Sequence, residues 1–209
     1  MKIAIRELIE HIPFTAIGAA TGIIIMVVLV LTNANQIVSE GLFHLTHPAH
    51  VLLSGLATTA MYRKYGKGGA AKAFVIGYAG SIGIATLSDV FIPYLGGTLL
   101  GIEMELHLPL IETEPMHLIG LPVWIIINTA ALAGILIGYL KPATHFPHTG
   151  HVLLSTWASL FNFTAYGVAN WIPLLFPIFI FLFISVWLPC CFSDIVFPLL
   201  WGVKEPVEH

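Results

Sequence analysis

Apolar stretches separated by short polar segments account for most of the chain. No Asp, Glu, Lys or Arg occurs at positions 11–39, 115–140 or 142–193. A membrane-spanning helix needs about 20 mostly apolar residues, and the last of these stretches is long enough for two such helices. The pattern predicts an all-α integral membrane protein with six transmembrane helices, at 12–32, 48–62, 70–95, 118–140, 150–168 and 172–201.

The composition supports a membrane protein whose main partner is the lipid bilayer. Of the 209 residues, 57% are hydrophobic and only 9% are charged, whereas a soluble domain carries about 25% charged residues. A disordered chain is excluded because such chains are polar and rich in charge. Eight Lys and Arg residues are too few for a basic groove, so we expect no nucleic-acid partner. Glu7 and Glu10 precede the first apolar stretch, which is too long for a cleavable signal peptide.

The distribution of charge predicts the orientation in the membrane. With six spans, all basic residues fall in segments on one side, namely Lys2, Arg6, Arg63, Lys64, Lys67, Lys72, Lys141 and Lys204. The segments on the other side carry the acidic residues Glu40, Glu103, Glu105, Glu112 and Glu114. Basic residues favour the cytoplasmic side. We therefore expect a protein of the plasma or inner membrane with both termini in the cytoplasm and an acidic outer face that attracts cations.

An internal repeat divides the chain into two halves. Residues 44–54 return 101 positions later as residues 145–155, and seven of the eleven positions are identical. The segment Ser-Asp-x-x-x-Pro at 88–93 returns at 193–198. Each half, 1–106 and 107–209, would contain three spans, so the second half would be inverted relative to the first. We expect a 3+3 inverted-topology repeat that forms one membrane domain, an arrangement typical of secondary transporters.

The repeated segments carry side chains suited to binding a metal ion. If the second span begins at Pro48, a residue favoured at the first helical position, then His47, His50 and Ser54 share one helix face and His44 precedes the helix. Acidic residues inside membrane spans are costly and indicate functional sites. The candidate ligands are His44, His47, His50 and Asp89 in the first half and His145, His148, His151 and Asp194 in the second. Ser54, Ser88, Ser155 and Ser193 are the candidate supporting residues.

The types of ligand limit the identity of the metal. Imidazole together with carboxylate suits divalent Zn, Fe, Mn, Co or Ni, whereas Mg and Ca prefer mainly oxygen ligands. Cys190 and Cys191 have no counterpart in the first half, which argues against a site built on cysteine. Adjacent cysteines rarely pair, so we expect no disulfide.

These observations favour a membrane transporter or channel for a divalent transition-metal cation, with proton coupling through the histidines. One alternative is a membrane-embedded hydrolase with a zinc site of His, Asp and Ser. Another is the membrane subunit of a b-type cytochrome, with histidines as axial haem ligands. We favour transport over catalysis because a hydrolase needs one site, whereas both copies of the motif are intact. The sequence leaves homo-oligomer formation open.

Overall fold

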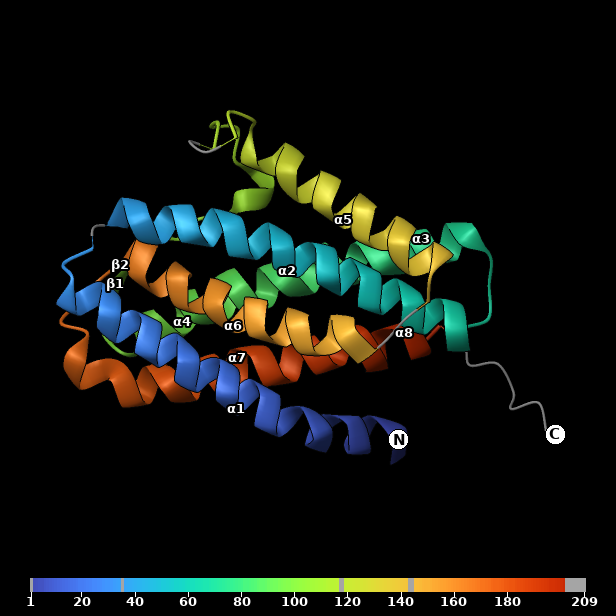
Figure 1. Ribbon diagram of the computed structural model, residues 1–209, viewed down its shortest axis with the longest axis horizontal. Helices are drawn as coiled ribbons and strands as arrows, with labels where there is room; N and C mark the ends of the chain where they lie inside the picture. The colour runs from blue at the N-terminus through green and yellow to red at the C-terminus, as the bar shows by residue number, and fades with distance from the viewer. Residues whose placement is uncertain (1, 35, 117–118, 143–144, 202–209) are drawn as a thin grey trace.

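The computed structural model describes residues 2–34, 36–116, 119–142 and 145–201 (Figure 1). The chain is mostly helical and passes repeatedly along the long axis of the molecule. Its long helical segments are α1 (Lys2–Leu31), α2 (Gln36–Tyr65), α3 (Ala70–Tyr78) continuing through η1 (Ala79–Ile84) and η2 (Leu87–Phe91) into α4 (Ile92–Leu99), α5 (Val123–Leu140), α6 (His145–Tyr166), and α7 (Leu175–Cys191) continuing through η5 (Phe192–Val196) into α8 (Phe197–Leu199). Short elements connect them, namely β1 (Glu103–Met104), η3 (Pro109–Ile111), β2 (Gly167–Val168) and η4 (Ile172–Leu174).

Four helices of the described chain are long and apolar enough to cross a membrane. They cover Ile12–Leu31, Ala70–Leu99, Val123–Leu140 and Ile172–Cys190. Large apolar side chains on these helices, such as Ile24 and Leu136, point away from the protein and are more than half exposed, as expected for a surface in contact with lipid. The protein is therefore a mostly helical chain whose apolar helices suit a membrane.

The two long helices outside this set, α2 and α6, are the most polar and lie inside the bundle. They pack against each other, α5 packs on α2, and α1 packs on α6 (Figure 1). Many of their histidines, serines and threonines are fully buried. Apolar helices thus surround a polar central pair.

The second helix differs from the sequence expectation. It begins at Gln36 rather than at Pro48, so Pro48 lies inside the helix and His44 lies on it. Proline removes one hydrogen-bond donor and usually marks a helix start or break, but the packing of α6 and α5 along α2 keeps the helix continuous. The consequence is that His44, His47 and His50 follow one another at intervals of three residues on a single helix.

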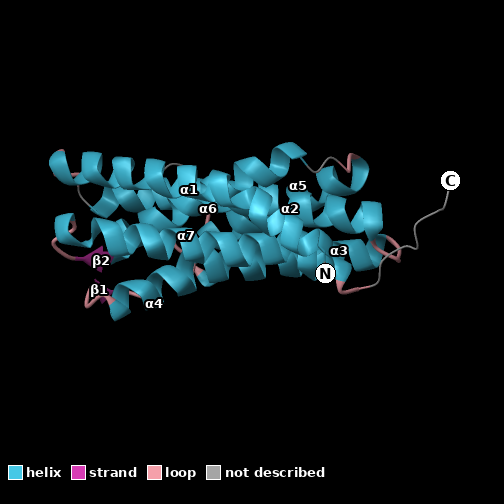
Figure 2. Cartoon of the chain, turned by 90° about the horizontal axis from the view of Figure 1, so that it is seen from below, coloured by secondary structure: helices cyan, strands magenta, loops and turns pink. Residues whose placement is uncertain are grey.

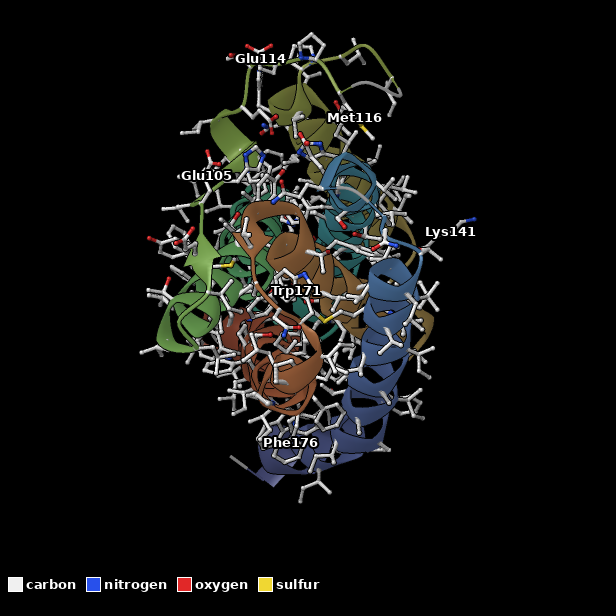
Figure 3. All side chains as sticks on the ribbon, turned by 90° about the vertical axis from the view of Figure 1, so that its left-hand side faces the viewer. Glu105, Glu114, Met116, Lys141, Trp171 and Phe176 are labelled. Carbon is white, nitrogen blue, oxygen red and sulfur yellow. The ribbon has the colours of Figure 1, made fainter. Side chains whose placement is uncertain are left out.

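Successive long segments run in opposite directions along the bundle. In Figure 1, α1, the α3–α4 segment and α6 run from right to left, and the other three run from left to right. The end where α1 begins also holds α8 and the basic residues that follow α2 and α5. The opposite end holds the acidic connection between α4 and α5, and Figure 3 looks onto this end, with Glu105 and Glu114 labelled.

A short antiparallel pairing of two strands distant in the sequence fastens the acidic connection to the bundle. β1 pairs with β2 antiparallel, with Glu103 opposite Val168 and Met104 opposite Gly167. Because β2 directly follows α6, the pairing holds the α4–α5 connection over the end of α6 (Figure 2). The side chains of this connection are therefore placed next to the ends of α2 and α6.

Close backbone contact between α5 and α2 depends on glycine. A Cβ atom at Gly134 would lie 2.1 Å from the carbonyl oxygen of Leu52, and one at Gly138 would lie 2.4 Å from that of Leu56. Glycines four residues apart let membrane helices approach closely. This contact fixes α2, which carries three of the candidate ligands, against the outer helix α5.

Candidate metal centre

Asp89 is the organising residue of the buried polar cluster. It is fully buried in η2. Its Oδ2 atom accepts hydrogen bonds from the Nδ1 atoms of His47 (2.8 Å) and His50 (2.7 Å). Its Oδ1 atom accepts from the hydroxyls of Ser88 (2.7 Å) and Ser155 (2.8 Å). The structure thus brings together two predicted histidines and the predicted aspartate of the first half, and adds a serine from the second half.

These four hydrogen bonds define the role that Asp89 can play. Each carboxylate oxygen already receives two donors, which is about its full capacity. The Nδ1 protons of His47 and His50 are then held by Asp89, which leaves Nε2 as the basic nitrogen of each ring. Carboxylates commonly orient metal-binding histidines in this way. Asp89 is therefore better placed to position the histidines than to bind a metal itself.

The Nε2 atom of His50 faces a second group of candidate ligands. It lies 3.8 Å from the Sγ atom of Cys190, and the ring of His50 stacks on that of His151 with centroids 5.5 Å apart. The three side chains are at most 2% exposed, and each offers one ligand atom within 4.8 Å of the others. Two imidazoles and a thiolate form a donor set typical of zinc and similar transition metals.

The serines of the two repeats make reciprocal contacts. Ser155 on α6 lies 3.3 Å from Ser88 of the first half, and Ser54 on α2 lies 3.5 Å from Ser193 of the second half. Ser193 in turn donates to the carbonyl oxygen of Gly80 at 3.2 Å. The repeated serine of each half, Ser54 or Ser155, therefore contacts the Ser-Asp motif of the other half.

Both Ser-Asp motifs lie in π-helical turns, η2 and η5. Each turn is followed by a proline, Pro93 or Pro198, which cannot donate a hydrogen bond to the carbonyl of the aspartate four residues earlier. Single π-helical turns within helices often accompany functional sites. The repeated sequence thus has the same unusual backbone in both halves.

The structure distributes the remaining predicted residues as follows. His44 does not join Asp89, because it lies about one turn before His47 on α2 and contacts Glu112 and His107 instead. Phe43 lies between, stacked on His47 with ring centroids 5.3 Å apart. The side chains of His145, His148 and Asp194 lie outside the described residues.

Three functional candidates were missed by sequence reasoning. Cys190 was set aside because the repeat places Ala85 at the equivalent position, yet its thiol lies beside His50. His107 and Glu112 lie in an irregular connection that no periodicity describes. The only available signal for them was a histidine within an acidic segment on the expected outer side.

Comparisons with known proteins add no identification. Models of known protein families, curated proteins and solved structures give no match to this chain. What the chain offers for a function is the site itself, namely buried imidazole, carboxylate, hydroxyl and thiol groups inside a bundle of apolar helices.

Proposed function

We propose that this protein is a membrane transporter or channel for a divalent transition-metal cation. One observation carries the proposal: buried imidazoles and hydroxyls of α2 and α6 form a polar track with the two Ser-Asp motifs, from His47 past Asp89 to Ser193. Ionisable groups inside a membrane protein are costly, and they commonly mark ion pathways. A static structural role would not need so many groups with metal-binding chemistry along one path.

The proposed topology is six membrane crossings in a 3+3 inverted repeat, with halves 1–106 and 107–209. It is supported by the alternating directions of the helical segments, which make each segment of the second half antiparallel to its counterpart. The reciprocal serine contacts are what a two-fold axis between the halves would produce. The basic end of the bundle would face the cytoplasm.

Within the track, the proposed central site consists of His50, His151 and Cys190. His50 and Asp89 belong to the first half, whereas His151 and Cys190 belong to the second, so the cation would lie between the halves, as in many secondary transporters. The thiolate favours softer cations such as Zn, Co or Ni over Mn. Asp89 would hold the ring of His50 in the orientation that aims Nε2 at the site.

The same geometry disfavours the alternatives. A zinc hydrolase must admit water and a substrate to an open position on the metal, whereas His50, His151 and Cys190 are at most 2% exposed. His50 and His151 stack face to face at 21°. Axial ligands of one haem instead direct their ring nitrogens at each other from opposite sides of the iron.

The test is metal flux into liposomes containing the purified protein, measured with an internal metal-sensitive dye for Zn²⁺, Co²⁺, Ni²⁺, Fe²⁺ and Mn²⁺. We expect wild-type flux and its loss in Cys190→Ala and His151→Ala. The matched controls are Ser185→Ala on α7 and Thr156→Ala on α6, because both hydroxyls donate to carbonyls of their own helices. Unchanged flux in the double variant Cys190→Ala/His151→Ala would refute the proposal.

A further inference from the structure

We infer that His44, His107 and Glu112 form a second transition-metal site at the acidic end of the bundle. The Oε2 atom of Glu112 lies 2.7 Å from the Nε2 atom of His107 and 3.2 Å from that of His44. The two Nε2 atoms lie 3.3 Å apart. Three ligand atoms from two separate parts of the chain thus meet at one point.

The distances fit a metal ion. Zinc bonds to nitrogen and oxygen of about 2.0–2.1 Å place the ligand atoms of a tetrahedral site about 3.3 Å apart. Two of the three separations are 3.2 and 3.3 Å. The third, between His107 and Glu112, is a 2.7 Å hydrogen bond that would lengthen by about 0.6 Å on metal binding. Two histidines and one carboxylate bind zinc or ferrous iron while leaving coordination positions open. Open positions suit a site that must take up and release its ion.

The loop residues of this site are held in place before any ion binds. The N–H of Glu105 donates to the carbonyl oxygen of Tyr166 at 2.8 Å. The ring of His107 stacks on Tyr166 with centroids 4.2 Å apart and planes 12° apart. The N–H of Trp124 donates to the carbonyl oxygen of Glu112 at 3.2 Å. Because the end of α6 and the start of α5 both anchor the loop, little ordering is needed on binding.

The site is more accessible than the central one. The side chains of His44, His107 and Glu112 are 7%, 20% and 14% exposed, whereas those of the central site are almost completely buried. Burial raises the pKa of the Glu112 carboxyl above its ordinary value, and the neighbouring His107 acts in the opposite direction. An ion arriving from the acidic end would therefore meet this group first.

Phe43 separates the outer site from the central cluster. It is fully buried, and its ring lies 5.7 Å from that of His44 and 5.3 Å from that of His47. The outer site would pass its ion on to the central site, and this role rests on the proposed function. Metal binding at the outer site can be tested without transport.

The experiment is titration of the full-length protein in detergent with Co²⁺, followed by absorbance and calorimetry. The decisive pair is Glu112→Gln and Glu114→Gln, which remove the same charge from the same loop, since Glu114 is exposed at the tip of the loop (Figure 3). We expect two bound ions in the wild type and in Glu114→Gln. Because even indirect partners of a metal are worth about 10–100-fold in affinity, Glu112→Gln should weaken one of the two sites by about 100-fold. The same two-ion stoichiometry and affinity in Glu112→Gln as in the wild type would overturn the inference.

The central site provides an internal check in the same titration. A thiolate-to-cobalt absorption band should persist in Glu112→Gln and report that the bundle is folded. If Glu112→Gln does not fold, His107→Ala removes a different ligand, and the same loss of one ion is expected. If the protein transports metal but substitution of Glu112 or His107 leaves Co²⁺ binding unchanged, the inferred outer site is wrong and the proposed transport stands. Binding that depends on Glu112 in a protein without flux would instead overturn the proposed transport and leave the outer site standing.

Discussion

Replacing Asp89 by Asn tests whether the carboxylate organises the central cluster. The amide has the same shape but only one oxygen. That oxygen can still accept from His47 and His50, while the new NH₂ group faces Ser88 and Ser155. The two hydroxyls must then rotate so that they accept hydrogen bonds rather than donate them. The substitution therefore converts four hydrogen bonds to a charged group into hydrogen bonds between neutral groups.

The expected cost follows from these four bonds. A hydrogen bond to a charged group contributes about 1.5–3 kcal/mol and a neutral one about 0.5–1.5 kcal/mol. Four such changes amount to ~4 kcal/mol, and removing a buried charge offsets part of this. We expect Asp89→Asn to lower the free energy of unfolding by about 2–4 kcal/mol. Asp89→Ala should cost more, because two buried imidazole donors lose their acceptor at about 1–3 kcal/mol each.

The assay is thermal unfolding in detergent, followed by circular dichroism, together with Zn²⁺ affinity by calorimetry. Loss of the orienting carboxylate should weaken Zn²⁺ binding about 10–100-fold. Ser81→Ala is the matched control, since this buried hydroxyl on the same segment donates to the carbonyl of Tyr78. Wild-type stability and wild-type Zn²⁺ affinity in Asp89→Asn would refute the reasoning.

Three further predictions address packing, symmetry and metal dependence. Gly134→Ala should lower the melting temperature, because overpacking against Leu52 costs about 1–3 kcal/mol. The control Gly41→Ala adds a methyl group with no atom within 4 Å and should not lower it, so equal effects of the two variants would contradict the α2–α5 contact. The double variant Ala85→Cys/Cys190→Ala moves the thiol to the repeat-related position. Cys190→Ala alone should lose Zn²⁺ binding and the double variant should regain it, so no recovery would count against the two-fold relation. Zn²⁺ at 100 times its Kd should stabilise the wild type by about 2.7 kcal/mol, and chelation should reverse this, while a chelator without effect on the melting curve would argue against a metal bound to the folded state.

The sequence predicted the apolar part of the fold better than its polar centre. The apolar pattern identifies the helices at Ile12–Leu31, Ala70–Leu99 and Val123–Leu140 closely, because lipid contact requires long apolar surfaces. The prediction was wrong for the start of α2, which extends twelve residues before Pro48. Hydropathy gives little signal there, because the polar side chains of that stretch face other protein groups instead of lipid.

The candidate site was predictable where local spacing decides it. Histidines three residues apart share a helix face, and the repeated Ser-Asp motif drew attention to Asp89. Cys190 was set aside because reasoning from a repeat discounts residues that have no counterpart. His107 reaches His44 through tertiary contacts of the loop, namely the pairing of β1 with β2 and the stacking of His107 on Tyr166. The sequence of the loop does not predict these contacts.

The departure from symmetry at the centre bears on how the proposed site would release its ion. His50 and His151 are equivalent in the repeat and stack on each other, but the thiol is supplied by the second half alone. A cation bound there would have two ligands from the second half and one from the first. A relative movement of the halves would then remove His50 and leave two ligands, which bind more weakly. A ligand can shift a conformational equilibrium only through different affinities for the two states, and an unequal ligand set shared between the halves provides that difference.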